Sequence, residues 1–166
     1  MGIKLLFKTF TGIHFSSEDF CKIGYKLAKK NNFFYKHRFL RFSKQYGVEI
    51  ENFQNIDSGL VLVHAFSITI NPSAKIGKNC VVFKGVTIGS VRSGKRSGCP
   101  IIGDNVVIGL NATVVGGITV GDDVFIAPNS FVNFDVPPHS LVIGNPGAIY
   151  SKEKNRINKD YIKCLQ

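Results

Sequence analysis

The stretch that decides the fold is residues 102–136, IGDNVVIGLNATVVGGITVGDDVFIAPNSFVNFDV. An aliphatic residue recurs in it every six positions, and a further residue, usually small or β-branched, follows four positions after each. The aliphatic series is Ile102, Ile108, Val114, Val120, Ile126 and Val132. A step of six is neither the 3.6-residue period of an α-helix nor the two-residue period of a strand. It is typical of a parallel β-helix built from hexapeptide repeats.

The repeat continues toward the N-terminus in two sections. One section keeps the series and contains Ile70, Ile76, Val82 and Ile88. The other is two residues out of register and contains Ile50, Ile56, Leu62 and Ile68. Each hexapeptide is expected to form one strand and one turn, and three hexapeptides close a triangular coil around the aliphatic side chains. Gly103 and Gly121 are expected at corners with a positive φ angle.

One insertion interrupts the repeat. Ile88 and Ile102 are fourteen residues apart, two more than two hexapeptides, and the polar stretch 90–98 between them (SVRSGKRSG) is predicted to loop out of the coils. Loops on a rigid scaffold commonly carry function. The proline-rich segment 136–138 is predicted to finish the β-helix.

Residues 1–46 do not follow the six-residue step. A helix is predicted over 17–31, with Phe20, Ile23 and Leu27 on one face, and a second over 33–45, ended by Gly47. These helices are expected to cap the first coil, because the terminal coils of a solenoid need capping. The sequence thus predicts a mainly β chain with a short N-terminal α-helical segment (1–46), a β-helix domain (47–150) and a C-terminal tail (151–166).

The charge of the chain is unevenly distributed. The formal net charge of the 166 residues is +10. Residues 1–46 hold ten Lys or Arg and two acids, so they carry +8 of it. Such an excess can bind an anionic membrane surface or nucleic acid, or can simply be a solvated face. No nucleic-acid-binding motif accompanies it, so nucleic acid is not an expected partner. The aromatic residues among these cations, such as Phe39 and Phe42, either contact an anionic membrane or pack on the first coil.

Neither a membrane span nor a secretory signal is expected. No stretch approaches the roughly 20 apolar residues of a span, and lysines interrupt the apolar residues at the N-terminus. The expected location is the cytoplasm, with the inner face of the membrane as a further expectation. The cysteines are Cys21, Cys80, Cys99 and Cys164, which form no C-x-x-C pair and are expected to be free thiols.

Residues 47–150 resemble the catalytic half of bacterial serine acetyltransferases and the related sugar O-acetyltransferases of surface-polysaccharide synthesis. The matching motifs are GVEI (47–50), VHAF (63–66), GVTIG (85–89), PIIGD (100–104), VVIG (106–109), VPPHS (136–140) and GNP (144–146). The repeat class implies a left-handed β-helix. The resemblance implies a homotrimer whose active site is completed by a neighbouring copy, and acetyl-coenzyme A as the acyl donor.

The resemblance also implies the site residues. His64 matches the family's general base, which an alcohol needs in order to attack a thioester near neutral pH. Glu49 stands at the position of the acid that orients this histidine; a histidine kept for structure and a solvated glutamate are the alternatives. The positions matching contacts to the thiol and pantetheine of coenzyme A are Gly89, Ser90, Gly109, Leu110, Ala127 and Pro128.

Two departures from serine acetyltransferases concern the acceptor. Val63 replaces an Asp before the histidine, and Gly98 and Cys99 replace an Arg-His pair in the projecting loop. In the family that Asp and Arg help to hold the serine zwitterion, whose charges are costly to desolvate unpaired. Lys95 and Arg96 could replace the Arg. A sugar hydroxyl is therefore the preferred acceptor, and serine O-acetylation is the alternative.

Three other possibilities remain at the level of the sequence. Cys99 is either part of the acceptor site or a semi-buried thiol at the base of the loop. No metal is expected, because a zinc lyase on this fold needs three histidines and the repeat region contains only His64 and His139, the latter interpreted as structural. A non-enzymatic β-solenoid is the last alternative, although it would not explain a histidine within a strand.

Overall fold

The computed structural model describes residues 17–29, 33–51, 53–151, 158 and 162. Within them two helices come first, α2 (Ser17–Lys29) and α3 (Phe33–Tyr46). The strands that follow are β1 (Val48–Ile50), β2 (Val61–Val63), β3 (Ile68–Ile70), β4 (Lys75–Ile76), β5 (Val81–Phe83), β6 (Thr87–Gly89), β7 (Ile101–Ile102), β8 (Val107–Ile108), β9 (Thr113–Val115), β10 (Thr119–Val120), β11 (Phe125–Ile126), β12 (Phe131–Val132), β13 (Ser140–Ile143) and β14 (Ala148–Ser151). Both predicted helices and the change to short strands after Gly47 are confirmed.

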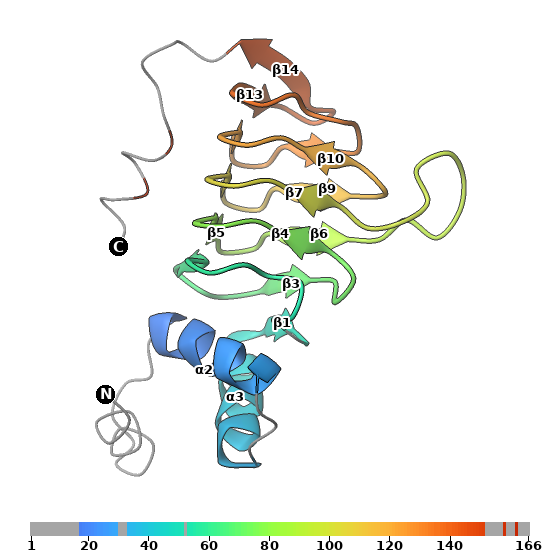
Figure 1. The fold of residues 1–166 in the computed structure, drawn as a ribbon. Helices are drawn as coiled ribbons and strands as arrows, with labels where there is room; N and C mark the ends of the chain where they lie inside the picture. The colour runs from blue at the N-terminus through green and yellow to red at the C-terminus, as the bar shows by residue number, and fades with distance from the viewer. Residues whose placement is uncertain (1–16, 30–32, 52, 152–157, 159–161, 163–166) are drawn as a thin grey trace.

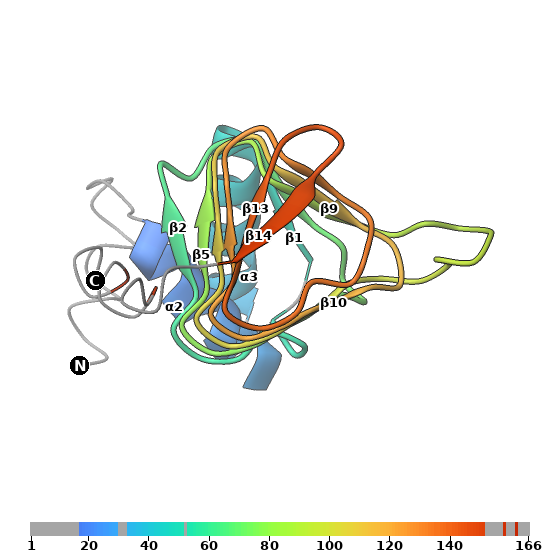
Figure 2. The same ribbon diagram turned by 90° about the horizontal axis from the view of Figure 1, so that it is seen from above.

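The strands form three sheets. Sheet A has the order β1-β3-β6-β9-β12, sheet B has β10-β7-β4, and sheet C has β14-β13-β11-β8-β5-β2. The chain visits A, B and C in turn, and the strands of neighbouring coils pair in parallel. The sheets are the faces of a triangular prism, seen from the side in Figure 1 and along its axis in Figure 2. This arrangement is typical of a left-handed parallel β-helix, as predicted.

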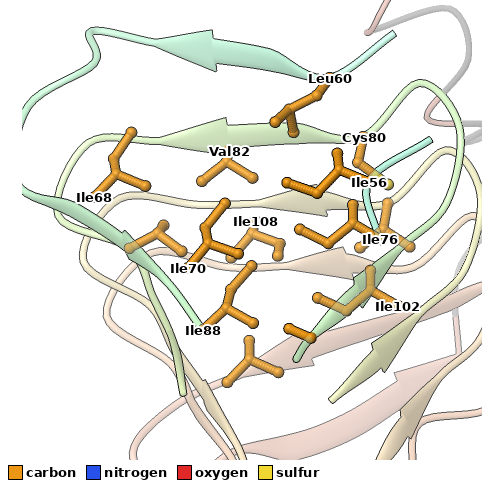
Figure 3. Close-up of a cluster of buried hydrophobic side chains, with 14 of the residues drawn as sticks. Ile56, Leu60, Ile68, Ile70, Ile76, Cys80, Val82, Ile88, Ile102 and Ile108 are labelled. Atoms are coloured by element: carbon orange, nitrogen blue, oxygen red, sulfur yellow. The ribbon is translucent and has the colours of Figure 1, made fainter. Parts of the chain in front are cut away.

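The aliphatic residues of the six-residue step form the core of the prism. Figure 3 shows side chains from all three faces pointing toward one another, among them Ile70, Val82 and Ile102. Each of these three is at most 3% exposed. Because parallel pairing places equivalent positions of successive coils side by side, the core is continuous from coil to coil. Removing these side chains from water is the main driving force for this fold.

The coils differ in length at two places. Thr69 pairs with Thr87 and Thr113 pairs with Phe131, in each case 18 positions later. Glu49 pairs with Thr69, 20 positions later, and Thr87 pairs with Thr113, 26 positions later. The first coil thus has two extra residues, which explains the two registers of the repeat. The 26-residue coil has eight extra residues and contains the loop.

The insertion is therefore larger than the sequence count suggested. Ile88 lies in sheet A and Ile102 lies in sheet B, the next face along the chain. Only one hexapeptide separates successive faces, so the fourteen residues consist of one hexapeptide and eight inserted residues. The interpretation of two residues beyond two hexapeptides was wrong, because spacing alone does not say which face a residue occupies. The loop itself projects from the prism as predicted (Figures 1 and 2).

The corner glycines have a different role from the predicted one. At the corner between sheets B and C, the residues with positive φ are Asn105 (56°) and Asp123 (55°), two positions after Gly103 and Gly121. Asn and Asp adopt this region more readily than other non-glycine residues. The glycines are needed for space instead: a Cβ atom at Gly103 would lie 2.9 Å from the backbone nitrogen of Asp122 in the next coil.

The two helices cap the N-terminal end of the prism, as predicted. Phe20 of α2 stacks on Phe39 and Phe42 of α3, with ring centroids 4.5 Å apart in both pairs, and Phe53 of the first coil meets Phe20 edge-on. Phe39 and Phe42 are buried, so these two side chains pack on the first coil and are not available to a membrane. In the described part of the chain no helix is long and apolar enough to span a bilayer.

The C-terminal end is finished by a hairpin and not by the proline-rich segment. β13 adds the last parallel strand to sheet C, and β14 returns antiparallel to it. The described residues of the predicted tail also pack on the prism. Ile162 covers Val81 and Val107 on the outer face of sheet C, and the Asn158 side chain donates to two backbone carbonyls at the corner. These residues of the tail therefore contact the β-helix.

Candidate active site

His64 lies at the irregular corner of the first coil. It directly follows β2, its side chain is exposed, and its φ angle is 51°. The expectation of a histidine within a strand was wrong, because the two extra residues of this coil begin here and the chain has left the sheet. Seven other described non-glycine residues also have a positive φ, and five of them are Asn or Asp, residue types that adopt this region readily. His64 differs from those five in its residue type and in lying at the irregular corner. The exposed position leaves the imidazole accessible to a substrate.

Glu49 lies in the middle of β1, on the outer face of sheet A. Its carboxylate accepts a hydrogen bond of 3.3 Å from the Thr69 hydroxyl in the next coil. Both Glu49 and His64 belong to the first coil, but no hydrogen bond joins their side chains among the described residues. The orienting role of Glu49 therefore stays a prediction.

A cavity of about 760 Å³ lies between α3 and β1. Glu49 lines it together with Glu51, Lys36 and Lys44, above a floor of apolar side chains. Its volume is within the range of small-molecule sites, but His64 is not among the lining residues. The cavity thus includes the candidate acid without the candidate base.

The six residues predicted to bind coenzyme A divide between two corners of the prism. Gly109 and Leu110 follow β8, and Ala127 and Pro128 follow β11, so these four form two layers at the end of sheet C. The layers are in close contact, since a Cβ atom at Gly109 would lie 2.7 Å from the backbone nitrogen of Pro128. Gly89 and Ser90 lie at the end of β6 in sheet A, at the next corner. One chain does not bring all six together.

The base of the projecting loop is a small polar cluster. The Asn71 side-chain nitrogen donates to the Ser90 hydroxyl over 3.3 Å, and the Cys99 thiol donates to the Asn71 side-chain oxygen Oδ1 over 3.3 Å. Asn71 thus joins the two residues that the sequence had singled out. Sequence reasoning missed Asn71, although the Asn-Pro pair at 71–72 is a turn signal that marks this corner.

A glycine pair holds the stem of the loop. The strands of the loop are bridged between Val91 and Gly98, and the backbone nitrogen of Gly117 donates to the Arg96 carbonyl over 2.8 Å. A Cβ atom at Gly116 would lie 2.9 Å from the same carbonyl oxygen. Only glycine allows this approach, so Gly116 and Gly117 are positioning residues that the sequence reasoning also missed.

The loop is cationic. Arg92, Lys95 and Arg96 are exposed, and residues 90–98 contain no acid. None of these three cations forms an ion pair within the described residues. The loop therefore offers positive charge to an anionic group of a ligand.

His139 and the buried cysteines Cys21 and Cys80 have structural surroundings. His139 Nδ1 lies 3.0 Å from the Asp123 carboxylate, which also accepts from the Asn158 backbone nitrogen over 2.7 Å. Burial raises the pKa of the Cys21 and Cys80 thiols to about 12, which keeps them protonated and unreactive. Among the described residues, no group of three or more His, Cys, Asp or Glu side chains could hold a metal ion.

The parallel prism, its six-residue repeat and its projecting loop define a hexapeptide-repeat protein. Residues 94–133 match the family model described as the hexapeptide repeat of succinyl-transferase. The serine acetyltransferase of Bacillus pumilus is 33% identical over 153 residues, which cover 92% of this chain and 70% of that protein. The serine acetyltransferase of Staphylococcus xylosus is 33% identical over 140 residues, which cover 84% of this chain and 65% of that protein.

Solved structures agree with this assignment. The crystal structure of Neisseria gonorrhoeae serine acetyltransferase matches with a TM-score of 0.66 and 31% identity, covering 87% of this chain and 57% of that one. The structure of the same enzyme in complex with serine matches with a TM-score of 0.58 and 35% identity, covering 72% and 47%. The chain belongs to the serine acetyltransferase family of hexapeptide-repeat acetyltransferases. It spans about two thirds of the length of these curated relatives and about half of these solved chains.

Proposed function

We propose that the chain is an acetyl-CoA-dependent O-acetyltransferase in which His64 is the general base. The observation that carries this proposal is the exposed His64 at the irregular corner of a β-helix whose relatives are serine acetyltransferases. His139 is also exposed with a φ angle of 55°, so the assignment of His64 depends on its match to the family's base and on its place at the irregular corner. The non-enzymatic solenoid is disfavoured because the relatives are serine acetyltransferases.

The reaction follows from this assignment. A ring nitrogen of His64 takes the proton of the acceptor hydroxyl while its oxygen attacks the thioester carbonyl carbon. A new C–O bond forms, the C–S bond breaks, and the departing coenzyme A sulfur receives the proton from the imidazolium. The products are an acetyl ester and free coenzyme A. Glu49 is proposed to orient the imidazole once substrates are bound, because catalytic hydrogen bonds often tighten only in the complex.

The residues proposed to bind coenzyme A lie at two different corners of the prism, and this separation supports a homotrimer. In a groove between two copies, the row formed by Gly109, Leu110, Ala127 and Pro128 comes from one copy. Gly89 and Ser90 come from its neighbour. A particle mass close to three times 18.3 kDa is therefore expected by light scattering.

Two acceptors are proposed, each on its own observation. L-serine is the first candidate, because the relatives above are serine acetyltransferases and one is solved in complex with serine. A sugar hydroxyl is the second, because Val63 and Gly98, at the positions of the family's Asp and Arg, carry no charge for a zwitterion. Lys95 and Arg96 could pair with a carboxylate, but among the residues singled out for the acceptor none would pair with an ammonium group.

A single assay separates the candidates. The purified protein is incubated with labelled acetyl-CoA and a panel of L-serine, other amino acids with hydroxyl groups, and free and nucleotide-linked sugars. A kcat/KM for L-serine above roughly 10⁴ M⁻¹s⁻¹, the low end for ordinary enzymes, supports the first candidate. Preferential acetylation of a sugar supports the second. A folded trimer that acetylates no hydroxyl would overturn the proposed function.

A further inference from the structure

Helix α3 has two faces of different character. Phe39 and Phe42 are buried against α2 and the first coil. The opposite face exposes a cationic stripe, which consists of Lys36, His37, Leu40, Arg41 and Lys44. These positions are three, four or one residue apart, so their side chains lie next to one another along the helix. Nothing in the proposed acetyl transfer uses this stripe.

The stripe lies in a long segment without acids. Residues 20–48 contain eight Lys or Arg and no Asp or Glu, and α3 itself has no acid in its first turn. Within the described residues, none of Lys36, Arg41 and Lys44 forms an ion pair. The nearest acids in the sequence are Asp19 and Glu49. Glu49 and Glu51 line the cavity that Lys36, Leu40 and Lys44 also line, but no ion pair joins them to these lysines within the described residues. His37 and Arg41 do not line that cavity, so the helix and its sequence neighbours supply no acid on their side of the stripe.

The stripe also has an apolar centre. Leu40 is 47% exposed, and it lines an open hollow of about 670 Å³ together with His37, Arg41, Lys44 and Gln45. An exposed aliphatic side chain ringed by cations is the arrangement that helices use at a lipid interface, where the apolar group enters the headgroup layer and the cations meet phosphates.

The geometry points to an anionic membrane surface as the partner of this stripe. A second copy of the chain is disfavoured, because two such stripes would bring like charges together. Nucleic acid offers phosphates too, but its single strands are held by stacking on aromatic rings, and the stripe contains no aromatic residue other than His37. Phe39 and Phe42 take no part, since they are buried. In the proposed trimer three stripes would bind together, which strengthens a weak contact.

The test is co-sedimentation of the full chain with vesicles at low salt. Vesicles with about 30% phosphatidylglycerol are compared with pure phosphatidylcholine, and the protein is expected to bind only the anionic ones. The variant Lys36→Gln/Arg41→Gln/Lys44→Gln should bind roughly 100-fold more weakly, from about fivefold for each cation near the surface. Leu40→Gln should weaken binding several-fold with no change in net charge.

A matched control removes the same charge elsewhere. The variant Lys75→Gln/Lys78→Gln/Lys84→Gln changes three exposed lysines of the prism and should keep binding within about threefold, since charges far from the surface are screened. Equal losses in both triple variants, or no binding to anionic vesicles at low salt, would overturn the inference. So would binding to duplex DNA that exceeds binding to vesicles. Sedimentation requires no acetyl transfer, so it fails or succeeds separately from the proposed function.

Discussion

The regular and irregular parts of the prism differ in what determines their residues. In the 18-residue coils, each side chain of the six-residue step is fixed by packing on its copies above and below. In the longer coils, the extra residues at the corner after β2 and in the loop 90–98 contribute little to the core. His64 and the cationic loop are found at these two places. The candidate base and the cationic loop are therefore found where the repeat is broken, whereas the side chains that stabilise the core are found where it is kept.

Removal of the candidate base should have the largest effect on activity. His64→Asn is expected to lower kcat by roughly 10²–10⁴, the range for loss of a general base. Asn tolerates a positive φ angle, so the corner should keep its shape and the melting temperature should hardly change. Steady-state kinetics with acetyl-CoA and thermal unfolding measure the two effects separately.

His64→Ala is the companion variant for this position. It removes the same base, and because histidine already carries a Cβ atom in this left-handed conformation, the stability should change by less than about 1 kcal/mol. Equal kinetics for the two variants would assign the loss to the imidazole. Activity within a factor of a few of the unaltered protein would show that the irregular corner is not catalytic. The contrast between a stabilising regular part and a catalytic irregular part would then be wrong.

Two adjacent isoleucines test the regular part. Ile102 points into the core and is 2% exposed, whereas Ile101 points outward from sheet B and is 48% exposed. Ile102→Ala should lower the free energy of unfolding by roughly 2–5 kcal/mol, because it leaves a cavity. Ile101→Ala should cost less than about 1 kcal/mol in the single chain. Urea unfolding measures both, and similar costs would mean that sheet B is buried between copies.

The smallest expected difference in stability between the two parts is that between alanine variants of Gly103, in the regular part, and Gly94, in the loop. A Cβ atom at Gly103 would meet the backbone of the next coil at 2.9 Å, whereas at Gly94, in the loop, it would have nothing within 4 Å. Gly103→Ala should cost roughly 1–3 kcal/mol through overpacking. Gly94→Ala, at φ 88°, should cost roughly 1 kcal/mol from backbone strain alone. A larger loss for Gly94→Ala would show that the loop contributes to stability after all.

The six-residue step predicted the core and the loop, and helical spacing predicted the two capping helices, because burial and periodicity are both visible in a sequence. The six-residue step did not show where the two extra residues of the first coil lie. After Leu62 the next core position could be Ile68 or Ile70, because both are isoleucine. The size of the insertion between Ile88 and Ile102 was also misjudged, because three equivalent faces look alike in sequence. Only the pairing of strands shows which face each residue occupies.

The candidate site was less predictable than the fold. His64 and the loop residues were found by resemblance, and their positions at irregular places agree with that choice. The contact of Asn71 with Ser90 and Cys99 spans 19 and 28 residues, and no periodic signal announces it. The packing of Ile162 on sheet C was invisible for the same reason. Contacts that occur once in a chain leave no pattern in its sequence.

The hairpin of β13 and β14 affects how molecules of this protein associate with one another. A parallel solenoid ends in unpaired backbone groups that could accept the first coil of another molecule, and repeated addition would give a fibre. Here β14 pairs with the last strand of sheet C, and Gly147 donates to the carbonyl of Phe131 in β12 over 2.9 Å. At the other end, α3 packs against β1. Both ends thus resist end-to-end polymerisation, so a fold made of repeats stays a particle of fixed length.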